Sequence, residues 1–398
     1  MGTSSLEGDA LPSGTAPIRK FYSDRSWIEG AAEDQLEFAA ALNGVISIAA
    51  FPDLHPGKYG PVGSAVLADR IYPQLIGNDI GCGMSLFALS LKSRKLRLDK
   101  AARRLRALEG PWDGDPQARL RNAGLPDNLH PQALGSIGGG NHFCELQTVE
   151  TVTDAEALSK ADLSPGDLVL LVHSGSRSLG MSVFSSVQDH FSGLRDKSDI
   201  GLTYLEAHNL AVRWASLNRV LIAERAAEQL RCEVRLISDA PHNLIERVSG
   251  AYLHRKGAAK ADLPLVPLAG SRDALSFLLK PARNKPGALA SLAHGSGRKY
   301  DRRSMSGRAG VTKSERENLT RTSFGGMVIC EDRQLLIEEA PGAYKDPATV
   351  LKELQIAGLA TPVASLKPLL TFKKAVPDDL EGARQNKRRR LAERRAMR

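Results

Sequence analysis

Two side chains that could bind a metal ion stand close together in the segment "LIGNDIGCGM" at residues 75–84. Asp79 offers a carboxylate and Cys82 offers a thiol, and glycines lie on both sides of the pair. Glycine adopts backbone conformations that other residues rarely enter, so the chain could turn sharply here and direct both side chains inward. The segment therefore predicts one part of a ligand site.

Histidines recur in a similar context elsewhere in the chain. Six of the nine lie in short polar or glycine-rich stretches, several of them just after an apolar run: His55, His142, His173, His242, His254 and His294. Loops at strand ends are where binding and catalytic residues gather. With the carboxylate and the thiol, these imidazoles form a suitable ligand set for one or two divalent ions. Such a mixed set does not select its metal, so Zn²⁺, Mn²⁺ and Fe²⁺ all remain open.

The segment "HGSGR" around His294 suggests a different chemistry. Gly295 and Gly297 leave the backbone open to a phosphate, and Arg298 offers a forked phosphate donor. Imidazole has a reference pKa of about 6.5, so its neutral form could attack phosphorus near pH 7. Taken alone, the segment favours the simpler interpretation of a glycine-rich turn with a hydrogen-bonded histidine. The chain has neither a Walker loop nor a GxGxxG motif, so any nucleotide site is of another kind.

The elements that must position these residues alternate irregularly. Strands are predicted at 45–50, 64–68, 168–172, 233–238, 275–279 and 327–330, and helices at 27–42, 93–110 and 203–230. In the last helix, Leu210, Trp214, Leu217 and Leu221 form an apolar stripe that should face a core. Strict βαβ units are absent, which favours an α+β fold over a doubly wound sheet. We expect one compact body with a loose arm at each end.

Composition narrows the class of protein. The 398 residues are 42% hydrophobic, which is enough for a large core. No apolar run reaches about 18 residues, so we expect no transmembrane helix. The polar start of the chain predicts a loose arm, not a signal peptide. Four cysteines without CxxC spacing fit a reducing compartment, and we expect a cytoplasmic protein.

Positive charge is concentrated at the end of the chain. The net charge is +9, and from Glu381 onward eight Lys and Arg residues stand against two Glu. Such a tail could give sequence-independent contacts with the phosphates of a nucleic acid, or it could be a solvated end that aids solubility. The sequence leaves both interpretations open.

Together these segments resemble the RtcB family of RNA-splicing and RNA-repair ligases. The matching segments run in family order from about residue 20 to residue 373: "PDLHPGKYGPVG", "GNDIGCGM", "LGSIGGGNHF", "LVHSGSRSLG", "HN" at 242–243, "LHRKGA", "AGSRDALS", "HGSGR", "EEAPGAYK" and "LKPLLTFK". Their shared order is more specific than any single motif. The first two and the last are most similar to the branch coupled to release factor H, which is associated with repair of damaged translation RNA.

The resemblance implies the family's own α+β fold. A single large domain over residues 20–375 would carry mixed and antiparallel sheets and flanking helices around a central metal-containing cleft. A disordered arm at residues 1–19 would precede this domain, and a basic tail at residues 376–398 would follow it. Three features depart from the family pattern: Ser296 replaces the usual alanine, "AGSRD" replaces the commoner "PGSMG", and a long basic tail follows Lys373, near which the chain of most members ends. The resemblance assigns no ligand role to His55 or His254.

The resemblance also implies roles for particular residues. The ligands of two Mn²⁺ ions would be Asp79, Cys82, His142, His173 and His242. His294 would be the nucleophile that takes GMP from GTP as a phosphoramidate. The implied GTP and GMP contacts are Asn141, His142, Phe143, Cys144, Glu145, His242, Asn243, Ala269, Gly270, Ser271, Arg272, Ser276, His294, Gly295, Ser296, Gly297, Tyr344 and Lys373. The predicted RNA contacts are Arg177, Arg255, Lys256, Arg298, Arg388, Arg389 and Arg390.

The implied reaction is RNA ligation in the repair of tRNA or ribosomal RNA. A 2′,3′-cyclic phosphate is opened to a 3′-phosphate and activated with GMP, and a 5′-hydroxyl then displaces GMP. The partners would be RNA with such ends and, in this branch, release factor H and damaged ribosomes. Two alternatives need fewer features: a metal-dependent phosphodiesterase or phosphatase without GTP, and a non-catalytic RNA-binding partner of a release factor.

Overall fold

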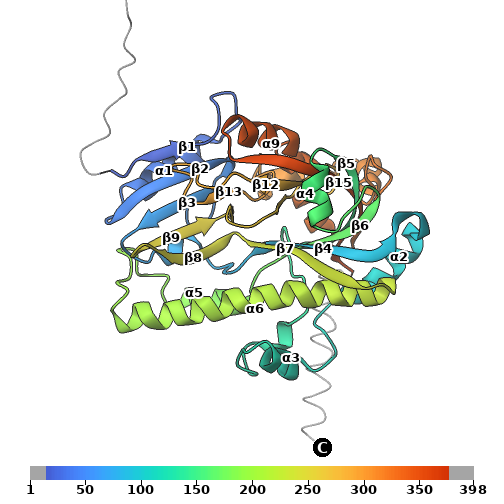
Figure 1. Cartoon of the computed structure of the whole chain (residues 1–398), viewed down its shortest axis with the longest axis horizontal. Helices are drawn as coiled ribbons and strands as arrows, with labels where there is room; N and C mark the ends of the chain where they lie inside the picture. Colours follow the sequence, from blue (N-terminus) through green and yellow to red (C-terminus); the bar gives the residue numbers. More distant parts are fainter. Residues whose placement is uncertain (1–14, 376–398) are drawn as a thin grey trace, which may run out of the picture.

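Two β-sheets form the frame of the protein, whose computed structural model describes residues 15–375 (Figure 1). The larger sheet has the strand order β11-β12-β15-β5-β6-β4-β7, and β14 pairs in parallel with β15. Its strands are β4 (Gly83–Lys92), β5 (Phe143–Val152), β6 (Asp167–Ser174), β7 (Val234–Pro241), β11 (Val266–Leu268), β12 (Ser276–Pro281), β14 (Met327–Cys330) and β15 (Ala360–Lys374). The Ser238 hydroxyl of β7 donates to the carbonyl of Leu265, 2.6 Å away and next to β11. The two end strands therefore meet, and the sheet is nearly closed.

The smaller sheet has the order β1-β2-β3-β9-β8, with β1 parallel to β2 and the other neighbours antiparallel. Its strands are β1 (Ile18–Lys20), β2 (Val45–His55), β3 (Val62–Ala68), β8 (Asn243–Val248) and β9 (Ala251–Lys256). A separate antiparallel pair joins β10 (Ala258–Lys260) to β13 (Ser291–Ala293). Because β7 leads into β8 and β13 leads into the His294 loop, residues from all three sheets approach one another.

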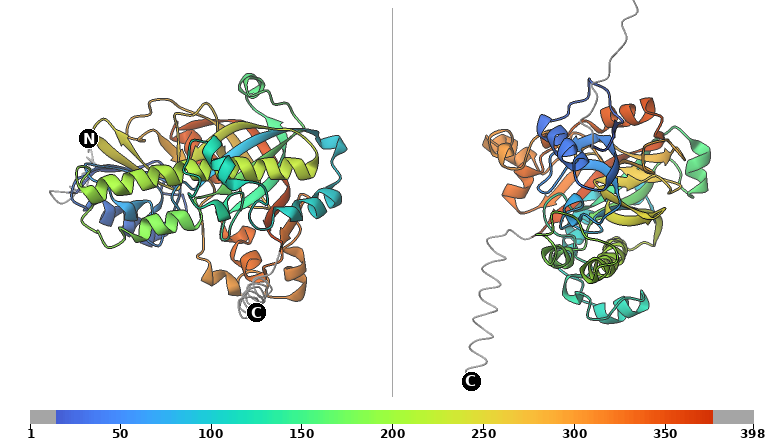
Figure 2. Two further views of the ribbon diagram at one scale, coloured as in Figure 1. Left: turned by 90° about the horizontal axis from the view of Figure 1, so that it is seen from below. Right: turned by 90° about the vertical axis from the view of Figure 1, so that its left-hand side faces the viewer.

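Helices lie around these sheets, some on their outer faces and others further out. They are α1 (Gly30–Ala40), α2 (Leu98–Leu105), α3 (Pro116–Asn122), α4 (Ala155–Lys160), α5 (Ser178–Ser185), α6 (Asp199–Leu230), α7 (Lys313–Asn318), α8 (Arg333–Glu338) and α9 (Pro347–Ile356). Short 3₁₀ turns are η1 (Pro73–Leu75), η2 (Ser93–Lys95), η3 (Arg106–Leu108), η4 (Pro131–Ala133), η5 (Arg303–Gly307) and η6 (Pro341–Ala343). In the turned views of Figure 2, the orange segment with η5 and α7 lies to one side of the sheets.

The long helix α6 runs beneath both sheets (Figure 1). The Ser198 hydroxyl accepts from the backbone N–H of Gly201 and caps its first turn, and Arg231 ends the helix in the left-handed conformation. Trp214 and Leu221 of the predicted stripe are buried, as expected for a helix with one apolar face. Asn218 and Arg219 are also fully buried on this helix, and Arg219 contributes to the site described below.

The structure agrees with the predicted fold class. The mixed α+β class is confirmed, and each predicted strand and helix overlaps an observed element, although only Leu98–Leu105 of the helix predicted at 93–110 is α-helical. Strand β1 pairs with β2 from Ile18, just before the predicted start of the catalytic domain at residue 20, and the division into domains stays a prediction. The predicted tail and most of the predicted arm lie outside the described residues. Within residues 15–375, none of the helices has the length and hydropathy needed to cross a bilayer.

Candidate active site

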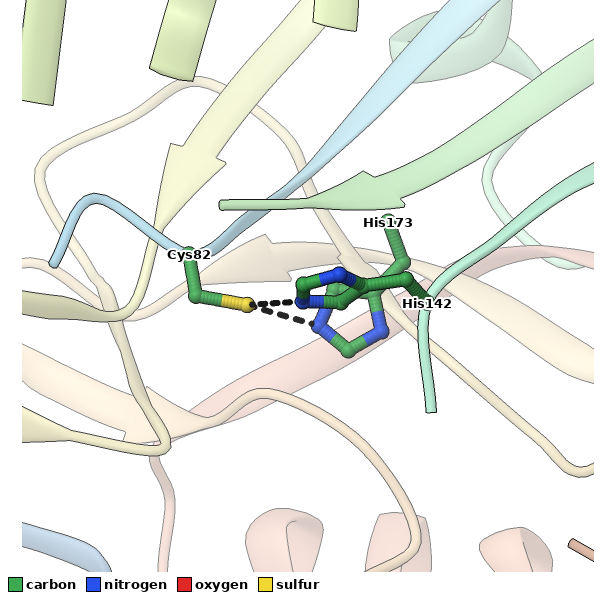
Figure 3. Close-up of side chains that lie close together, drawn as sticks. All are labelled: Cys82, His142 and His173. Atoms are coloured by element: carbon green, nitrogen blue, oxygen red, sulfur yellow. Dashed lines mark hydrogen bonds between the residues drawn. The ribbon is translucent and has the colours of Figure 1, made fainter. Parts of the chain in front are cut away.

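Adjacent strands of the larger sheet bring three predicted ligands together (Figure 3). Cys82 comes just before β4, His142 just before β5, and His173 near the end of β6, which lies between those strands. The Cys82 sulfur lies 3.1 Å from Nε2 of His173 and 3.4 Å from Nε2 of His142. All three side chains are buried, and their ligand atoms lie within 4.8 Å of one another. Three donors that converge this closely form a compact candidate metal site.

The other two predicted ligands border this cluster. The carboxylate of Asp79 lies 3.0 Å from Nε2 of His142. His242 follows β7, which pairs with β4, and its backbone N–H donates to the carbonyl of Cys82 at 2.8 Å. Its ring centroid lies 5.2 Å from that of His173 and 4.3 Å from that of His294. His242 thus links the cluster to the predicted nucleophile.

The protonation states of these groups fit a divalent cation. Burial holds the pKa of His173 and His242 well below the usual range, so their rings are neutral, which is the form that binds metals. Nδ1 of His173 donates to the carbonyl of Asn141, which leaves the Nε2 lone pair facing Cys82. Burial also raises the pKa of the Cys82 thiol, and a bound cation would favour its thiolate. Within the described chain, Nδ1 of His242 is buried without a hydrogen-bond partner.

A buried arginine supports the segments that carry these ligands. The guanidinium of Arg219, on α6, donates to the carbonyls of Gly81 and Ser174 at 2.7 and 2.9 Å. It also forms an ion pair with Asp239 of β7 at 2.7 Å. Those three contacts lie next to Cys82, next to His173 and close to His242. Arg219 was not predicted from the sequence, because a polar residue of a long helix shows no sign of burial until the helix packs against its neighbours.

The glycines of "GNDIGCGM" have a structural explanation. Gly81 has φ 74°, a conformation that residues with a side chain rarely adopt. A Cβ at this position would lie 2.9 Å from both the Val212 Cα and the Ala215 Cβ of α6. The absence of a side chain therefore lets the chain turn against the helix between Asp79 and Cys82.

His294 is held by a carboxylate that the sequence analysis did not single out. Its Nδ1 lies 2.7 Å from Oδ2 of Asp53 in β2 and 2.7 Å from the carbonyl of Gly257. Asp53 is fully buried, and its Oδ2 also accepts from the His294 backbone N–H at 3.1 Å. Both neighbours of Nδ1 are acceptors, so this nitrogen carries the proton and Nε2 keeps its lone pair. Asp53 lies in the segment "PDLHPGKYG", two residues before His55, and this polar segment next to a strand is the sequence signal for it.

The loop after His294 packs closely against β2. Gly297 has φ 70°, and a Cβ there would lie 2.2 Å from the Asp53 carbonyl oxygen. Gly295 forms an isolated parallel bridge with Ala269. The backbone N–H and the hydroxyl of Ser296 both donate to the Ala269 carbonyl, at 3.0 and 3.1 Å. The serine in place of alanine is thus accommodated by a hydrogen bond, and it ties the two phosphate-friendly loops together.

A cavity of about 240 Å³ opens beside His294. Its lining includes most of the predicted nucleotide contacts: Asn141, Phe143, Glu145, His242, Asn243, Ala269, Gly270, Ser271, Arg272, His294, Gly295, Ser296, Gly297, Tyr344 and Lys373. Cys144 differs, because its side chain packs into the apolar core on the other face of β5. The Ser276 hydroxyl accepts from the Gly270 backbone N–H at 3.0 Å and so supports the wall of the cavity.

Charged residues gather at one end of this cavity. Glu339 is buried and lies 3.8 Å from the ammonium of Lys373 and 3.1 Å from the guanidinium of Arg298. Tyr344 donates a short hydrogen bond to the same carboxylate. Arg272 donates to the carbonyls of Glu339 and Leu336 at 2.9 and 3.0 Å. The residue that departs from the family pattern therefore braces the segment that carries Glu339.

The predicted RNA contacts differ in their surroundings. Arg255 is 2% exposed, forms an ion pair with Glu246, and donates to the Ser291 hydroxyl. Its guanidinium is thus engaged inside the protein. Lys256 is also buried, and burial lowers its pKa to about 8. Arg177 is partly buried, with Nε 3.3 Å from the Ser136 hydroxyl. Arg388, Arg389 and Arg390 lie outside the described residues.

His55 and His254, which had no predicted ligand role, lie in different surroundings. The Nε2 atom of His254 accepts from the Tyr72 backbone N–H at 2.8 Å, and its Nδ1 donates to the Val66 carbonyl. His254 is therefore a buried structural residue. His55 donates through Nδ1 to the Asp53 carbonyl at 2.8 Å and lines the cavity, and burial lowers its pKa to about 4.

Comparison with known proteins identifies the family to which the chain belongs. The model of the family described as "tRNA-splicing ligase RtcB" matches residues 35–113 and 115–374. The chain belongs to the RtcB family. It is 43% identical to the RNA-splicing ligase RtcB2 of Escherichia coli over 362 residues, which cover 88% of this chain and 94% of the relative. It is 26% identical to the RNA-splicing ligase RtcB of Mycobacterium tuberculosis, over 84% of this chain and 99% of the relative.

Membership of the RtcB family confirms the resemblance predicted from the ordered motifs. A third relative, the tRNA-splicing ligase RtcB of Thermococcus kodakarensis, is 26% identical over 457 residues. The match to the family model extends across the metal cluster, His294 and the cavity. The predicted enzyme class, an RtcB RNA ligase, is confirmed with them.

Proposed function

We propose that this chain is a GTP- and Mn²⁺-dependent RNA ligase of the RtcB type. It joins a 3′-phosphate or 2′,3′-cyclic phosphate end to a 5′-hydroxyl end through a guanylyl group on His294. The observation that carries this proposal is the contact of Nδ1 of His294 with Asp53 and Gly257. A ring held in this way presents the Nε2 lone pair as a nucleophile. Because Nε2 carries no proton, no general base is needed to activate it.

Five residues would hold the metal ions: Asp79, Cys82, His142, His173 and His242. Two Mn²⁺ ions bound there would polarise the phosphates of the nucleotide and neutralise charge that develops in the transition state. The chain supplies both the oxygen and the sulfur donor from one short segment. Arg219 keeps that segment, β6 and β7 in register with one another.

The cavity beside His294 would hold the nucleotide. The buried carboxyl of Glu145 lines it, within hydrogen-bond distance of Thr371 and Gln147. A carboxylate can accept from N1–H and the amino group of guanine, whereas adenine has no such pair of donors. We assign guanine selection to Glu145, and we assign to Lys373 and Tyr344 the closing of the pocket around the base. The backbone between Gly295 and Gly297 would face the phosphate.

The covalent steps of the proposed reaction use His294 as the nucleophile and Asp53 as its partner. His294 Nε2 attacks the α-phosphorus of GTP, a P–N bond forms, and pyrophosphate leaves. Asp53 stabilises the positive charge that the ring acquires during this step. Water first opens a 2′,3′-cyclic phosphate to a 3′-phosphate by breaking the P–O2′ bond. The guanylyl group then passes from His294 to the RNA 3′-phosphate, which breaks the P–N bond and restores the free histidine. A 5′-hydroxyl attacks the activated phosphate and GMP departs.

This assignment separates the ligase from the two alternatives. A phosphodiesterase or phosphatase would need the metal cluster but neither GTP nor a guanylyl group on His294. A non-catalytic RNA-binding protein would need none of the three. The functional link to release factor H and damaged ribosomes is proposed only from the variants of three motifs, "PDLHPGKYGPVG", "GNDIGCGM" and "LKPLLTFK".

The test is an end-joining assay with defined RNA. One strand ends in a 3′-phosphate and the other begins with a 5′-hydroxyl, and both are incubated with the protein, GTP and Mn²⁺. Joining is expected only when GTP is present, and strands with a 3′-hydroxyl and a 5′-phosphate should not be joined. Release of inorganic phosphate without joining would identify a phosphatase and would contradict the proposal.

A further inference from the structure

Two aromatic rings, that of the exposed Trp27 and that of the half-buried Tyr300, meet close to the candidate active site. Trp27 lies just before α1 and is 42% exposed, which is unusual for so large an apolar side chain. Its ring centroid lies 6.3 Å from that of Tyr300, with the ring planes at 62°. Trp27 comes from the start of the folded chain and Tyr300 from the segment after His294. The contact thus joins two regions that are distant in sequence.

Cations surround this aromatic pair. The guanidinium carbon of Arg308 lies 4.1 Å from the centroid of Tyr300, and the ammonium of Lys299 lies 5.5 Å from it. The ammonium of Lys345 lies 5.9 Å from the centroid of Trp27. Arg308 is exposed, and Arg302 and Arg303 in the same segment are exposed too. The surface therefore combines aromatic faces with positive charge.

The aromatic pair is connected directly to the residues around His294. The backbone N–H of Lys345 donates to the Gly297 carbonyl at 3.0 Å. Its ammonium donates to the carbonyls of Pro52 and Leu54, which flank Asp53, at 3.0 and 2.7 Å. Arg298 and Arg302, on either side of Tyr300, line the cavity. A strand leaving the cavity along this segment would reach the two rings.

We propose that Trp27 and Tyr300 form a stacking platform for the bases of the single-stranded RNA end that enters the active site. Arg308, Lys299 and Arg303 contact the phosphates of that strand. Aromatic faces interleaved with cations are the recurring means of binding single-stranded nucleic acid, because every base has a π-face and every linkage a negative charge. The platform deepens the proposed ligase function and rests on it for the identity of the strand.

The test measures binding of a single-stranded RNA of about ten nucleotides with a 3′-phosphate, in the absence of GTP. Loss of one stacked base weakens binding about fivefold or more, which is the expected effect of Trp27→Ala. Trp27→Phe keeps a stacking face and should bind within about twofold of the wild type. Phe191→Ala is the matched control, because Phe191 is 69% exposed and belongs to a different pocket.

A second probe separates stacking from a structural role. With an otherwise identical oligonucleotide that lacks its bases, Trp27→Ala and the wild type should bind equally. Guanylylation of the protein by GTP alone should also be unchanged in Trp27→Ala. Equal binding of the base-bearing RNA by Trp27→Ala and the wild type would overturn the proposal. An equally large loss of affinity for the abasic probe in Trp27→Ala would also overturn it, and so would a loss of guanylylation. Either result would mean that Trp27 only supports the position of Lys345.

The same data distinguish failure of the platform from failure of the ligase assignment. If the wild type does not become guanylylated but its RNA binding still depends on Trp27 and on the bases, the platform stands and the ligase function fails. If guanylylation proceeds and binding ignores Trp27, the ligase function stands and the platform fails.

Discussion

Nδ1 of His294 lies 2.7 Å from Oδ2 of Asp53, a carboxylate with no exposed surface. The same oxygen accepts from the backbone N–H of His294, so it fixes both the ring and its attachment. The carbonyl of Gly257 also lies 2.7 Å from Nδ1. Because both groups beside Nδ1 are hydrogen-bond acceptors, Nδ1 must be the donor. The tautomer with a proton on Nδ1 is thereby selected before any nucleotide binds. This relationship makes His294 a nucleophile through Nε2.

Asp53→Asn should slow guanylylation of His294 by about 100-fold or more, because a misplaced ring proton removes the nucleophilic lone pair. An asparagine amide can donate to Nδ1 and so stabilise the opposite tautomer. The rate is measured in a single turnover with α-labelled GTP. Metal content should stay at the wild-type value, since Asp53 belongs to no predicted ligand set. A wild-type rate in this variant would show that Asp53 does not orient the ring.

Cys82→Ala should lower the metal content and abolish guanylylation while the fold persists. Its sulfur lies between two imidazoles, and alanine cannot supply a donor there. Metal is measured in the purified protein by elemental analysis, and the fold by circular dichroism. Cys232→Ala is the control, because Cys232 packs against the core behind the larger sheet. Normal metal content in Cys82→Ala would remove the thiol from the site.

Asp239→Asn should destabilise the protein by about 3 kcal/mol at pH 7, because it leaves the Arg219 guanidinium buried without its counter-ion. Burial alone would raise the pKa of Asp239, but Arg219 and two serine hydroxyls lower it below the ordinary value of 3.8. A carboxyl with a lowered pKa in the folded state stabilises above the unfolded-state pKa and loses this effect as the pH falls. The difference from the wild type should therefore shrink below about pH 4.

Urea unfolding at pH 7 and at acidic pH measures this difference. Asp162→Asn is the control, since Asp162 is 92% exposed and its ion pair with Arg235 lies on the surface. That substitution should change stability by less than about 1 kcal/mol. Equal effects of the two substitutions would contradict a supporting role for the buried ion pair.

Deletion of residues 381–398 tests the two interpretations of the basic tail. If its arginines and lysines contact RNA phosphates, each lost contact should lower the slope of log binding against log salt by about 0.7 for a single strand. Guanylylation with GTP alone should persist, because Lys373 and every proposed ligand remain. Filter binding across a salt series provides the measurement. An unchanged slope would identify the tail as a solvated end.

Much of this structure follows from local patterns in the sequence. The apolar stripe of α6 and the β-rich runs predict their elements because burial is periodic along a helix or strand. The metal cluster was accessible for a similar reason: its ligands lie in short segments next to strands, and adjacent strands place Cys82, His142 and His173 together.

The functional residues that the sequence did not predict contact groups that are far from them in the sequence. Asp53 and His294 are separated by 241 residues, and only the packing of β2 against the His294 loop makes the carboxylate the ring's partner. Arg219 resembles any polar residue of a long helix until the fold buries it beneath three ligand segments. Cys144 stays a predicted nucleotide contact through its backbone alone, because the alternation of β5 turns its side chain to the core.

The most direct test of the central claim is covalent labelling of the whole protein with α-labelled GTP and Mn²⁺. The predicted result is a guanylyl adduct on His294 that is stable in alkali and labile in acid, as a P–N bond to imidazole is. His294→Ala should retain no label, while Phe191→Ala should label as the wild type does. Label on His294→Ala equal to that on the wild type would contradict the account.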